Sequence, residues 1–326
     1  MTNIIDELKW RGAVNQVSDE ENLSKLLDEK SVGVYCGTDP TGDSLHVGHL
    51  IPFMMLKRFQ LAGHRAFILI GGGTGSIGDP SGRSTERTLQ TMEQVHHNEE
   101  ALTSQMKKLF GEDNITIVNN YDWLSKISLL DFLRDYGKLF NINTMLNKEV
   151  VASRLEVGIS FTEFTYQILQ AVDFHHLLLE NDVQLQIGGA DQWGNITAGI
   201  DLIHKMEGSD TQAFALTIPL MLKADGTKFG KSAGGAVWLD LKRRRPMNFI
   251  SSGSIKMIVM LSSISNTSRS LAKKKSKNLP KKLKRNRKSE KHSVVLLKKL
   301  LNSFMEKKQF IRLSIFPKLC SPVSKI

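Results

Sequence analysis

The sequence has only two cysteines, Cys36 and Cys320, among its 326 residues. Two cysteines cannot supply a disulfide framework, so we expect a reducing, cytoplasmic environment. The longest apolar runs are far shorter than the ~20 residues that a membrane helix needs. The first residues also lack the basic and apolar regions of a signal peptide. These absences argue against a secreted, disulfide-rich protein and against a membrane protein.

Acidic residues and glycine become scarce after Asp240. Residues 241–326 contain 24 Lys and Arg against two Asp and Glu, whereas residues 1–240 contain 20 against 31. Of the 25 glycines, only Gly253 follows Asp240. We therefore predict a folded domain over residues 1–240. The remaining residues, 241–326, are expected to form a basic tail that is poorly ordered or weakly helical.

Residues 1–240 alternate short apolar runs with longer helical segments. Strands are expected at 31–35, 66–70, 114–118 and 183–187, helices at 45–62, 129–139, 161–180 and 192–205, and a glycine-rich loop at 71–82. The run from Ala66 to Ile70 is apolar throughout, which is typical of a strand buried on both faces. This alternation predicts an α/β fold, a Rossmann-like parallel sheet with helices on both faces.

One candidate site lies where a predicted strand passes into a predicted helix. His46 and His49 are three residues apart, so they share one face of the first helical turn, and Gly48 between them leaves room for a ligand. A helix N-terminus favours phosphate through its free N–H groups and dipole, and two imidazoles can donate to phosphate oxygens. For this motif alone, a capped helix with two surface histidines is the better explanation.

A second candidate is the segment Lys228-Phe-Gly-Lys231-Ser232. A glycine-containing loop with two lysines suits the stabilisation of charge that develops on a pyrophosphate. Alone, this segment is better explained as an ordinary exposed loop.

A third candidate is one face of the predicted helix 161–180. Tyr166, Gln170 and Asp173 are spaced i, i+4 and i+7, so they line the same side of the helix. Core packing is the alternative, but an unpaired carboxylate such as that of Asp173 is costly to bury. Tyr35 ends the first predicted strand, at the edge where α/β sheets bind ligands.

Together, the histidine and lysine motifs resemble the HIGH and KMSKS signatures of class I aminoacyl-tRNA synthetases. The segments between them resemble the tyrosine branch and occur in the expected order: Gly71–Arg83, Asn119–Trp123, Gly158–Tyr166, Gln186–Asn195 and Leu216–Pro219. The resemblance covers essentially all of residues 1–240. It points to the bacterial-type tyrosine–tRNA ligase family.

This resemblance implies roles for individual residues. The substrate phenol would be held by Tyr35 and Asp173, and its α-ammonium by Tyr166, Gln170 and Asp79. Gln192 belongs to the same site and lies beside Gly189 and Asp191, which resemble a ribose-binding site. Further nucleotide contacts would come from Asp39, Thr41, His46, His49, Lys228, Lys231 and Ser232. Arg83 and Arg87 lie on a loop expected to fold over the phosphates, although solvated surface arginines are nearly as good an interpretation.

The implied reaction is in-line attack of the tyrosine carboxylate on the α-phosphate of ATP, with Mg²⁺ accompanying the ATP. Because the carboxylate is already an anion, no general base is required. Catalysis then consists of positioning and charge stabilisation by His46, His49, Lys228 and Lys231, with Thr41 beside them. Tyrosine tRNA is the expected acceptor. A homodimer is expected through the region around residues 129–140.

The resemblance stops after Asp240, where the family continues with helical anticodon-binding and RNA-binding regions. Codons can be chosen for Leu241–Met247 that read Pro-Glu-Lys-Thr-Ser-Pro-Tyr in the frame one base away, which is the family's pattern. We therefore hypothesise a one-base frameshift, in the gene or its sequencing, just after Asp240. Resequencing the gene tests this hypothesis.

Other functions remain open on the sequence. A tryptophan–tRNA ligase shares both signatures, but Tyr35 with Asp173 suits a phenol. A different nucleotidyltransferase with the same histidine motif is disfavoured by the late lysine motif. A non-enzymatic alternative is an inactive synthetase-like domain whose basic tail binds RNA phosphates non-specifically.

Overall fold

The computed structural model describes residues 3–81, 88–111, 114–152, 154–156, 158–220 and 238–240. All of them fall within the first of the chain's two units, residues 1–264. The predicted basic tail, the lysine motif with Lys228, Lys231 and Ser232, and the two loop arginines Arg83 and Arg87 lie outside the described residues.

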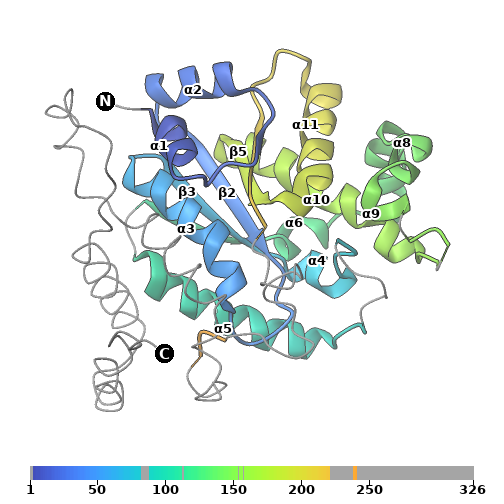
Figure 1. The fold of residues 1–326 in the computed structure, drawn as a ribbon. Coiled ribbons are helices and arrows are strands. Elements are labelled where there is room, and N and C mark those ends of the chain that lie inside the picture. The colour runs from blue at the N-terminus through green and yellow to red at the C-terminus, as the bar shows by residue number, and fades with distance from the viewer. Residues whose placement is uncertain are drawn as a thin grey trace, which may run out of the picture. The chain divides into compact units, whose positions relative to one another are not determined.

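In the described part, six strands form one sheet in the order β1-β6-β5-β2-β3-β4. Figure 1 labels three of them, β2, β3 and β5. The strands are β1 (Gln16–Val17), β2 (Gly33–Thr38), β3 (Arg65–Ile70), β4 (Ile115–Asn119), β5 (Val183–Gly189) and β6 (Phe214–Ile218). All neighbouring strands run parallel except β1, which pairs antiparallel with β6. The predicted Rossmann-like α/β fold is confirmed. The antiparallel edge strand was not predicted, because two residues are too few to show a pattern.

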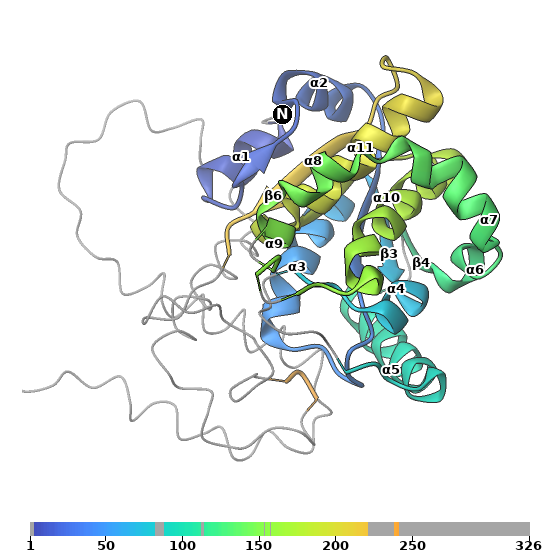
Figure 2. The ribbon, with the colours of Figure 1, turned by 90° about the vertical axis from the view of Figure 1, so that its right-hand side faces the viewer.

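Helices pack on both faces of this sheet (Figures 1 and 2). One face is covered by α1 (Ile4–Trp10), α2 (Glu20–Glu29), α3 (Val47–Leu61) and α5 (Met92–Phe110), whose side chains share a core with Val34, Ile68 and Leu185. The other face is covered by α10 (Phe161–Asn181) and α11 (Trp193–Glu207), which pack on Tyr35 and Phe67. The α10 helix confirms the predicted helix 161–180 and carries the candidate site face.

Shorter elements connect these helices: α4 (Gly72–Ile77), α6 (Tyr121–Leu124), α7 (Leu129–Asp131), a π-helical turn (Phe132–Tyr136), 3₁₀ turns (Gly137–Leu139 and Ala190–Gln192), α8 (Ile142–Leu146) and α9 (Glu149–Ala152). The predicted loop 71–82 therefore contains a helix. Glycine's low helix propensity hid it, yet glycine is needed, because a Cβ on Gly75 would lie 2.7 Å from Pro40 Cδ. The predicted helix 129–139 also changes type along its length.

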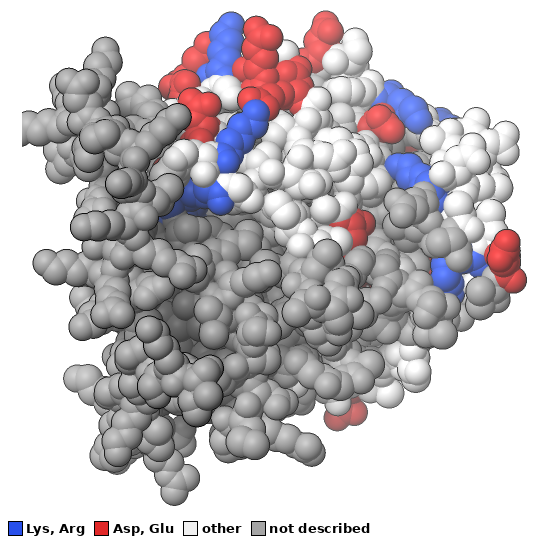
Figure 3. Space-filling view, viewed as in Figure 1, with Lys and Arg blue, Asp and Glu red and all other residues white. Residues whose placement is uncertain are grey.

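On the face shown in Figure 3, acidic and basic side chains are interspersed over α1 and α2. Some of them pair, as Lys9 does with Glu20 and Lys25 with Glu29. This part of the described surface therefore has no patch of one sign for nucleic-acid phosphates.

A buried ion pair fixes the start of α10. Arg154 is 3 % exposed and Glu163 is 1 % exposed, and Arg154 Nη2 lies 2.8 Å from Glu163 Oε2. The same guanidinium nitrogen donates to the carbonyl of Gly158 at 3.2 Å, and Ser160 caps the helix by accepting from Glu163 N. The pair thus joins the segment before α10 to its first turn.

Replacing Arg154 with leucine is expected to lower the free energy of unfolding by about 3–5 kcal/mol, because Glu163 stays buried without its counter-charge. Urea denaturation followed by circular dichroism measures this change. The double variant Arg154→Leu/Glu163→Leu should regain most of the loss. A double variant as unstable as the single one would show that the charge on Glu163 is not the cause.

Candidate functional site

A cavity of about 590 Å³ opens at the carboxyl ends of the parallel strands. Its walls come from the ends of β2, β5 and β6, from the first turns of α3 and α4, and from α10. The sheet order places this cavity where the connections from β2 and β5 leave toward opposite sides. In open α/β sheets that is the position where ligands bind.

The closed end of the cavity is organised around the carboxylate of Asp173, which is 2 % exposed. Asn120 Nδ2 donates to Asp173 Oδ2 at 2.8 Å, and Trp123 Nε1 donates to Asp173 Oδ1 at 2.8 Å. Both donors follow β4 at the carboxyl edge of the sheet. They hold the carboxylate in one orientation, facing the cavity that it lines.

Burial raises the pKa of Asp173 to about 8, although the hydrogen bonds from Asn120 and Trp123 lower it and the charge of Asp39 raises it further. Since an unfolded aspartate titrates near 3.8, the folded chain keeps a proton that the unfolded chain releases between about pH 4 and pH 8. The contribution of this group to the free energy of unfolding therefore falls as pH rises through that window.

We expect the carboxyl ¹³C resonance of Asp173 to titrate near pH 8 in the ligand-free chain, apart from the surface aspartates. The measurement is a pH series of NMR spectra on ¹³C-aspartate-labelled protein, with Asp173→Asn to assign the signal. A resonance that titrates near pH 4 would show that the two donors outweigh burial.

Tyr35 and Gln186 lie beside Asp173 on the floor of the cavity. They are register partners on β2 and β5, so their side chains share one face of the sheet. Both residues are buried, and within the described part Tyr35 Oη and Gln186 Oε1 have no hydrogen-bond partner. Leaving buried polar atoms unpaired costs free energy. This floor is therefore suited to a ligand that brings a hydroxyl group.

Tyr166 and Asp39 meet on the wall above this floor. Tyr166 Oη donates to Asp39 Oδ2 at 2.9 Å, and Thr74 Oγ1 donates to Asp39 Oδ1 at 2.8 Å. Burial raises the pKa of Tyr166 well above its ordinary value, and the charges of Asp39 and Asp79 add to the effect. The carboxylate of Asp39 thus contacts Tyr166, which the resemblance gave to the amino acid, although the resemblance gave Asp39 itself to the nucleotide alone.

The remaining predicted amino-acid contacts form a second polar cluster. Gln192 Nε2 donates to Asp79 Oδ2 at 2.8 Å, and Asn195 Nδ2 donates to Gln170 Oε1 at 3.1 Å. Asn195 is also 3.4 Å from Gln192 Oε1. The cluster supplies a carboxylate and amide oxygens, which are acceptors for an ammonium group.

The histidine motif forms another wall of the cavity. His46 is the N-cap of α3 and His49 lies in its first turn, as predicted. His46 N donates to His49 Nδ1 at 3.3 Å, and the two rings stack with centroids 3.6 Å apart. Burial lowers the pKa of His46 to about 4, so this imidazole is neutral at pH 7. A neutral imidazole keeps one N–H to donate to an anion.

Residues 238–240 are fixed against the histidine motif. Leu239 N donates to the carbonyl of Leu45 at 2.8 Å, and Asp240 N donates to Ser44 Oγ at 3.1 Å. Trp238 forms an isolated β-bridge with His46, and their ring centroids are 6.0 Å apart. Trp238 and Leu220 both line the cavity. The described residues on either side of the segment with the lysine motif therefore line the same cavity.

The other predicted nucleotide residues, Thr41, Gly189 and Asp191, line the same cavity. Gly189 ends β5, and a Cβ there would lie 2.7 Å from Asp191 Oδ1. A side chain at this position would therefore displace the carboxylate that is expected at the ribose.

Sequence reasoning assigned no role to several residues of this site, namely Thr74, Asn120, Trp123, Gln186, Asn195 and Trp238. The segment Asn119–Trp123 was recognised by resemblance, but no role was assigned to it. A usable signal was present, because an asparagine and a tryptophan directly follow an apolar strand at the ligand-binding edge.

Comparison with known proteins gives one consistent result. Residues 27–307 match the family described as tRNA synthetases class I (W and Y). The chain is 83 % identical over 247 residues to a tyrosine–tRNA ligase of Ligilactobacillus salivarius and 78 % identical to that of Limosilactobacillus reuteri. Each match covers 76 % of this chain and 59 % of the relative, so the chain spans about three fifths of their length.

Solved structures agree. The fold is similar to a C-terminally truncated mitochondrial tyrosyl-tRNA synthetase of Coccidioides posadasii, with a TM-score of 0.71 and 28 % identity, covering 93 % of this chain and 89 % of that one. The corresponding Aspergillus nidulans structure gives a TM-score of 0.70 at 28 % identity, covering 81 % and 82 %. The family match also extends past Asp240, beyond the predicted domain boundary.

Proposed function

The chain belongs to the class I tRNA synthetases of the tryptophan and tyrosine group, and from this premise we propose that it activates L-tyrosine with ATP to form tyrosyl-adenylate. The observation that carries the proposal is the closed end of the cavity, where the Asp173 carboxylate lies among buried donors and Tyr35 Oη has no partner in the described part. A phenol hydroxyl can donate to Asp173 and accept from Tyr35.

The same groups favour tyrosine over phenylalanine and tryptophan. Phenylalanine would leave Asp173 and Tyr35 without a ligand partner in a buried site, and buried polar groups are costly to leave unpaired. An indole N–H could donate to Asp173, but it could not accept from Tyr35. A phenol therefore satisfies both groups at once.

The α-ammonium of the substrate is proposed to bind Asp79, Gln170 and Tyr166. Its carboxylate then points toward the histidine motif, where the ATP phosphates would meet His46 and His49 at the start of α3. Attack of the carboxylate oxygen on the α-phosphorus forms the adenylate bond, and the electron pair of the breaking P–O bond leaves with pyrophosphate. The histidine N–H groups stabilise the charge that develops on the phosphate oxygens.

Mg²⁺ is proposed to enter with ATP, bound to its phosphates. Among the described residues no group of three or more His, Cys, Asp or Glu side chains could hold a metal ion.

None of the described helices is long and apolar enough to cross a membrane. We also propose a cytoplasmic location, because Cys36, the one described cysteine, is a free thiol.

Transfer of tyrosine to tyrosine tRNA is the proposed second step. The relatives extend well beyond the matched region, and residues 241–326 are predicted to differ from the tRNA-binding part of the family. We therefore expect this chain to activate tyrosine but to charge tRNA poorly.

The test is tyrosine-dependent ATP–pyrophosphate exchange by the purified 326-residue chain, with phenylalanine and tryptophan as controls. Exchange with tyrosine alone supports the proposal. Exchange with tryptophan would assign the chain to the other amino acid of the group. Folded protein that exchanges with none of the three would support the inactive, RNA-binding alternative.

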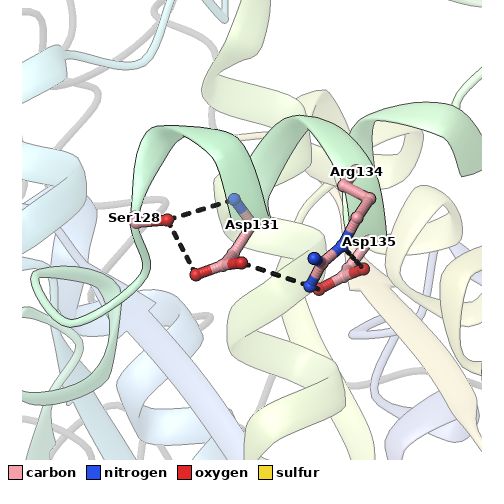
Figure 4. Close-up of polar contacts among 4 residues, drawn as sticks. All are labelled: Ser128, Asp131, Arg134 and Asp135. Atoms are coloured by element: carbon pink, nitrogen blue, oxygen red, sulfur yellow. Dashed lines mark hydrogen bonds and ion pairs between the residues drawn. The ribbon is translucent and has the colours of Figure 1, made fainter.

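A homodimer is also proposed, through the expected region around residues 129–140 together with the segment that continues from it to the start of α10. Its large apolar side chains are solvent-exposed: Leu129, Leu130, Leu133, Ile142, Leu155 and Phe161. Figure 4 shows that nearby polar groups pair with one another, since Ser128 contacts Asp131 and Arg134 contacts Asp131 and Asp135. These polar groups are already paired within the segment, whereas the exposed leucines have no apolar surface to pack against in the described part. Exposed apolar patches of this kind mark protein interfaces.

Replacing Leu130, which is 77 % exposed, with glutamate is expected to convert the dimer to monomers, because it places a charge in an apolar interface. Analytical ultracentrifugation measures the change. Leu61→Glu is the matched control, since Leu61 is exposed at the end of α3. A Leu130→Glu chain that sediments like the unchanged protein would place the interface elsewhere.

A further inference from the structure

A continuous chain of hydrogen bonds joins Asp173, on the floor of the cavity, to Asp39 on its wall. From the amino-acid end, Asn120 Nδ2 donates to Asp173 Oδ2 at 2.8 Å and also to Thr74 Oγ1 at 2.9 Å. Thr74 Oγ1 in turn donates to Asp39 Oδ1 at 2.8 Å. Asp39 begins the loop that leads to Thr41 and the histidine motif. Two side chains thus connect two carboxylates that lie 134 positions apart in the sequence.

The direction of each bond in this chain is fixed. Asn120 Oδ1 accepts the backbone N–H of Gly73 at 2.8 Å, so its amide cannot flip without losing that bond. Both hydrogens of the Asn120 amide are then used, one for each neighbour. The Thr74 hydroxyl accepts from Asn120, which leaves its single hydrogen for Asp39. Each carboxylate is therefore an acceptor at one end of the chain, Asp173 from Asn120 and Asp39 from Thr74.

This chain is shielded from water. Thr74 is 2 % exposed and Asn120 is fully buried. In surroundings of low dielectric, linked hydrogen bonds polarise one another, and a change at one bond alters its neighbours more than it would in water. A movement of Asp39, or a new hydrogen-bond partner for it, must therefore change the strength of the hydrogen bond from Thr74. That change in turn alters the hydrogen bond from Asn120 to Asp173.

We propose that Thr74 is a positioning residue that couples Asp39 to Asp173, so that a nucleotide in contact with Asp39 changes the affinity of Asp173 for the phenol. The proposal rests on the proposed function, since it concerns the same two ligands. Coupling of this kind is reciprocal, so tyrosine must change the affinity for the nucleotide by the same factor.

The test measures the Kd for tyrosine by calorimetry, with and without saturating α,β-methylene-ATP, which cannot react. We expect the two values to differ about fivefold or more in the unchanged chain and in Thr74→Ser, which keeps the hydroxyl. In Thr74→Val, which keeps the shape but not the hydroxyl, the ratio should approach one. A ratio in Thr74→Val equal to that of the unchanged chain overturns the proposal, as does a ratio of one in the unchanged chain.

A second measurement needs no variant of Thr74. The chain has four tryptophans, and the indole N–H of Trp123 reports directly on Asp173. In ¹⁵N spectra, α,β-methylene-ATP alone should shift the Trp123 indole signal, assigned with Trp123→Phe, while the exposed Trp10 serves as an internal control. An unmoved Trp123 signal with nucleotide bound overturns the coupling alone. Failure of the unchanged chain to bind tyrosine at all overturns the proposed function as well.

Discussion

Asp173→Asn is expected to reduce kcat/KM for tyrosine in ATP–pyrophosphate exchange by about 10³-fold. The carboxylate accepts from Asn120 and Trp123 on separate oxygens. An asparagine offers one oxygen, so its own N–H₂ faces a buried donor, at a cost of about 1–3 kcal/mol. Above pH 8, where Asp173 is ionised, the phenol also loses a charged acceptor, which is worth about 1.5–3 kcal/mol. Since each 1.4 kcal/mol is about tenfold, these losses combine to the stated magnitude.

Glu180→Gln is the control for this substitution. Glu180 lies on the same helix, α10, and is exposed. The substitution therefore removes one negative charge without changing the cavity. We expect its exchange rate to stay within about twofold of the unchanged chain, as surface substitutions usually do. If Asp173→Asn retained activity within tenfold while folded, Asp173 could not be the main acceptor for the phenol.

His46→Ala and His49→Ala are each expected to lower kcat of the exchange reaction by about 10²-fold, with KM for tyrosine changed only a few fold. Losing one donor to a developing oxyanion typically costs a factor of this size. Both rings stand at the N-terminus of α3, away from the buried floor formed by Tyr35 and Asp173. Because the pKa of His46 is about 4, its protonation should not shape the rate between pH 6 and 8.

His97→Ala, on the exposed side of α5, is the matched control and should leave both constants unchanged. Steady-state exchange kinetics over a range of tyrosine and ATP concentrations separate the two constants. A histidine variant that raised KM for tyrosine and left kcat unchanged would show that these side chains bind the amino acid and not the phosphates.

The sequence predicts the fold well where patterns are long. The apolar run at Ala66–Ile70 became β3, and the spacing of Tyr166, Gln170 and Asp173 correctly placed three cavity residues on α10. Local patterns of this kind depend on the period of the element alone. They do not depend on which distant segment packs against it.

The features that the sequence did not predict are those that depend on tertiary packing. The helix α4 forms in a glycine-rich stretch because Gly71 and Gly75 allow close contact with Asp39 and Pro40, which lie well before α4 in the chain. Thr74 becomes important only when α4 brings it between Asn120 and Asp39. Propensity rules concern neighbours in sequence, so they give no signal for such a link.

The contact between residues 238–240 and the loop before α3 also bears on how modules can be exchanged in this chain. Asp240 is tied to Ser44, and Leu239 to Leu45, by hydrogen bonds that involve no residue beyond position 240. A polypeptide grafted after Asp240 would therefore start from a fixed point beside the cavity. In protein engineering terms, Asp240 is a fusion point at which different carboxy-terminal segments can be compared beside one unchanged cavity.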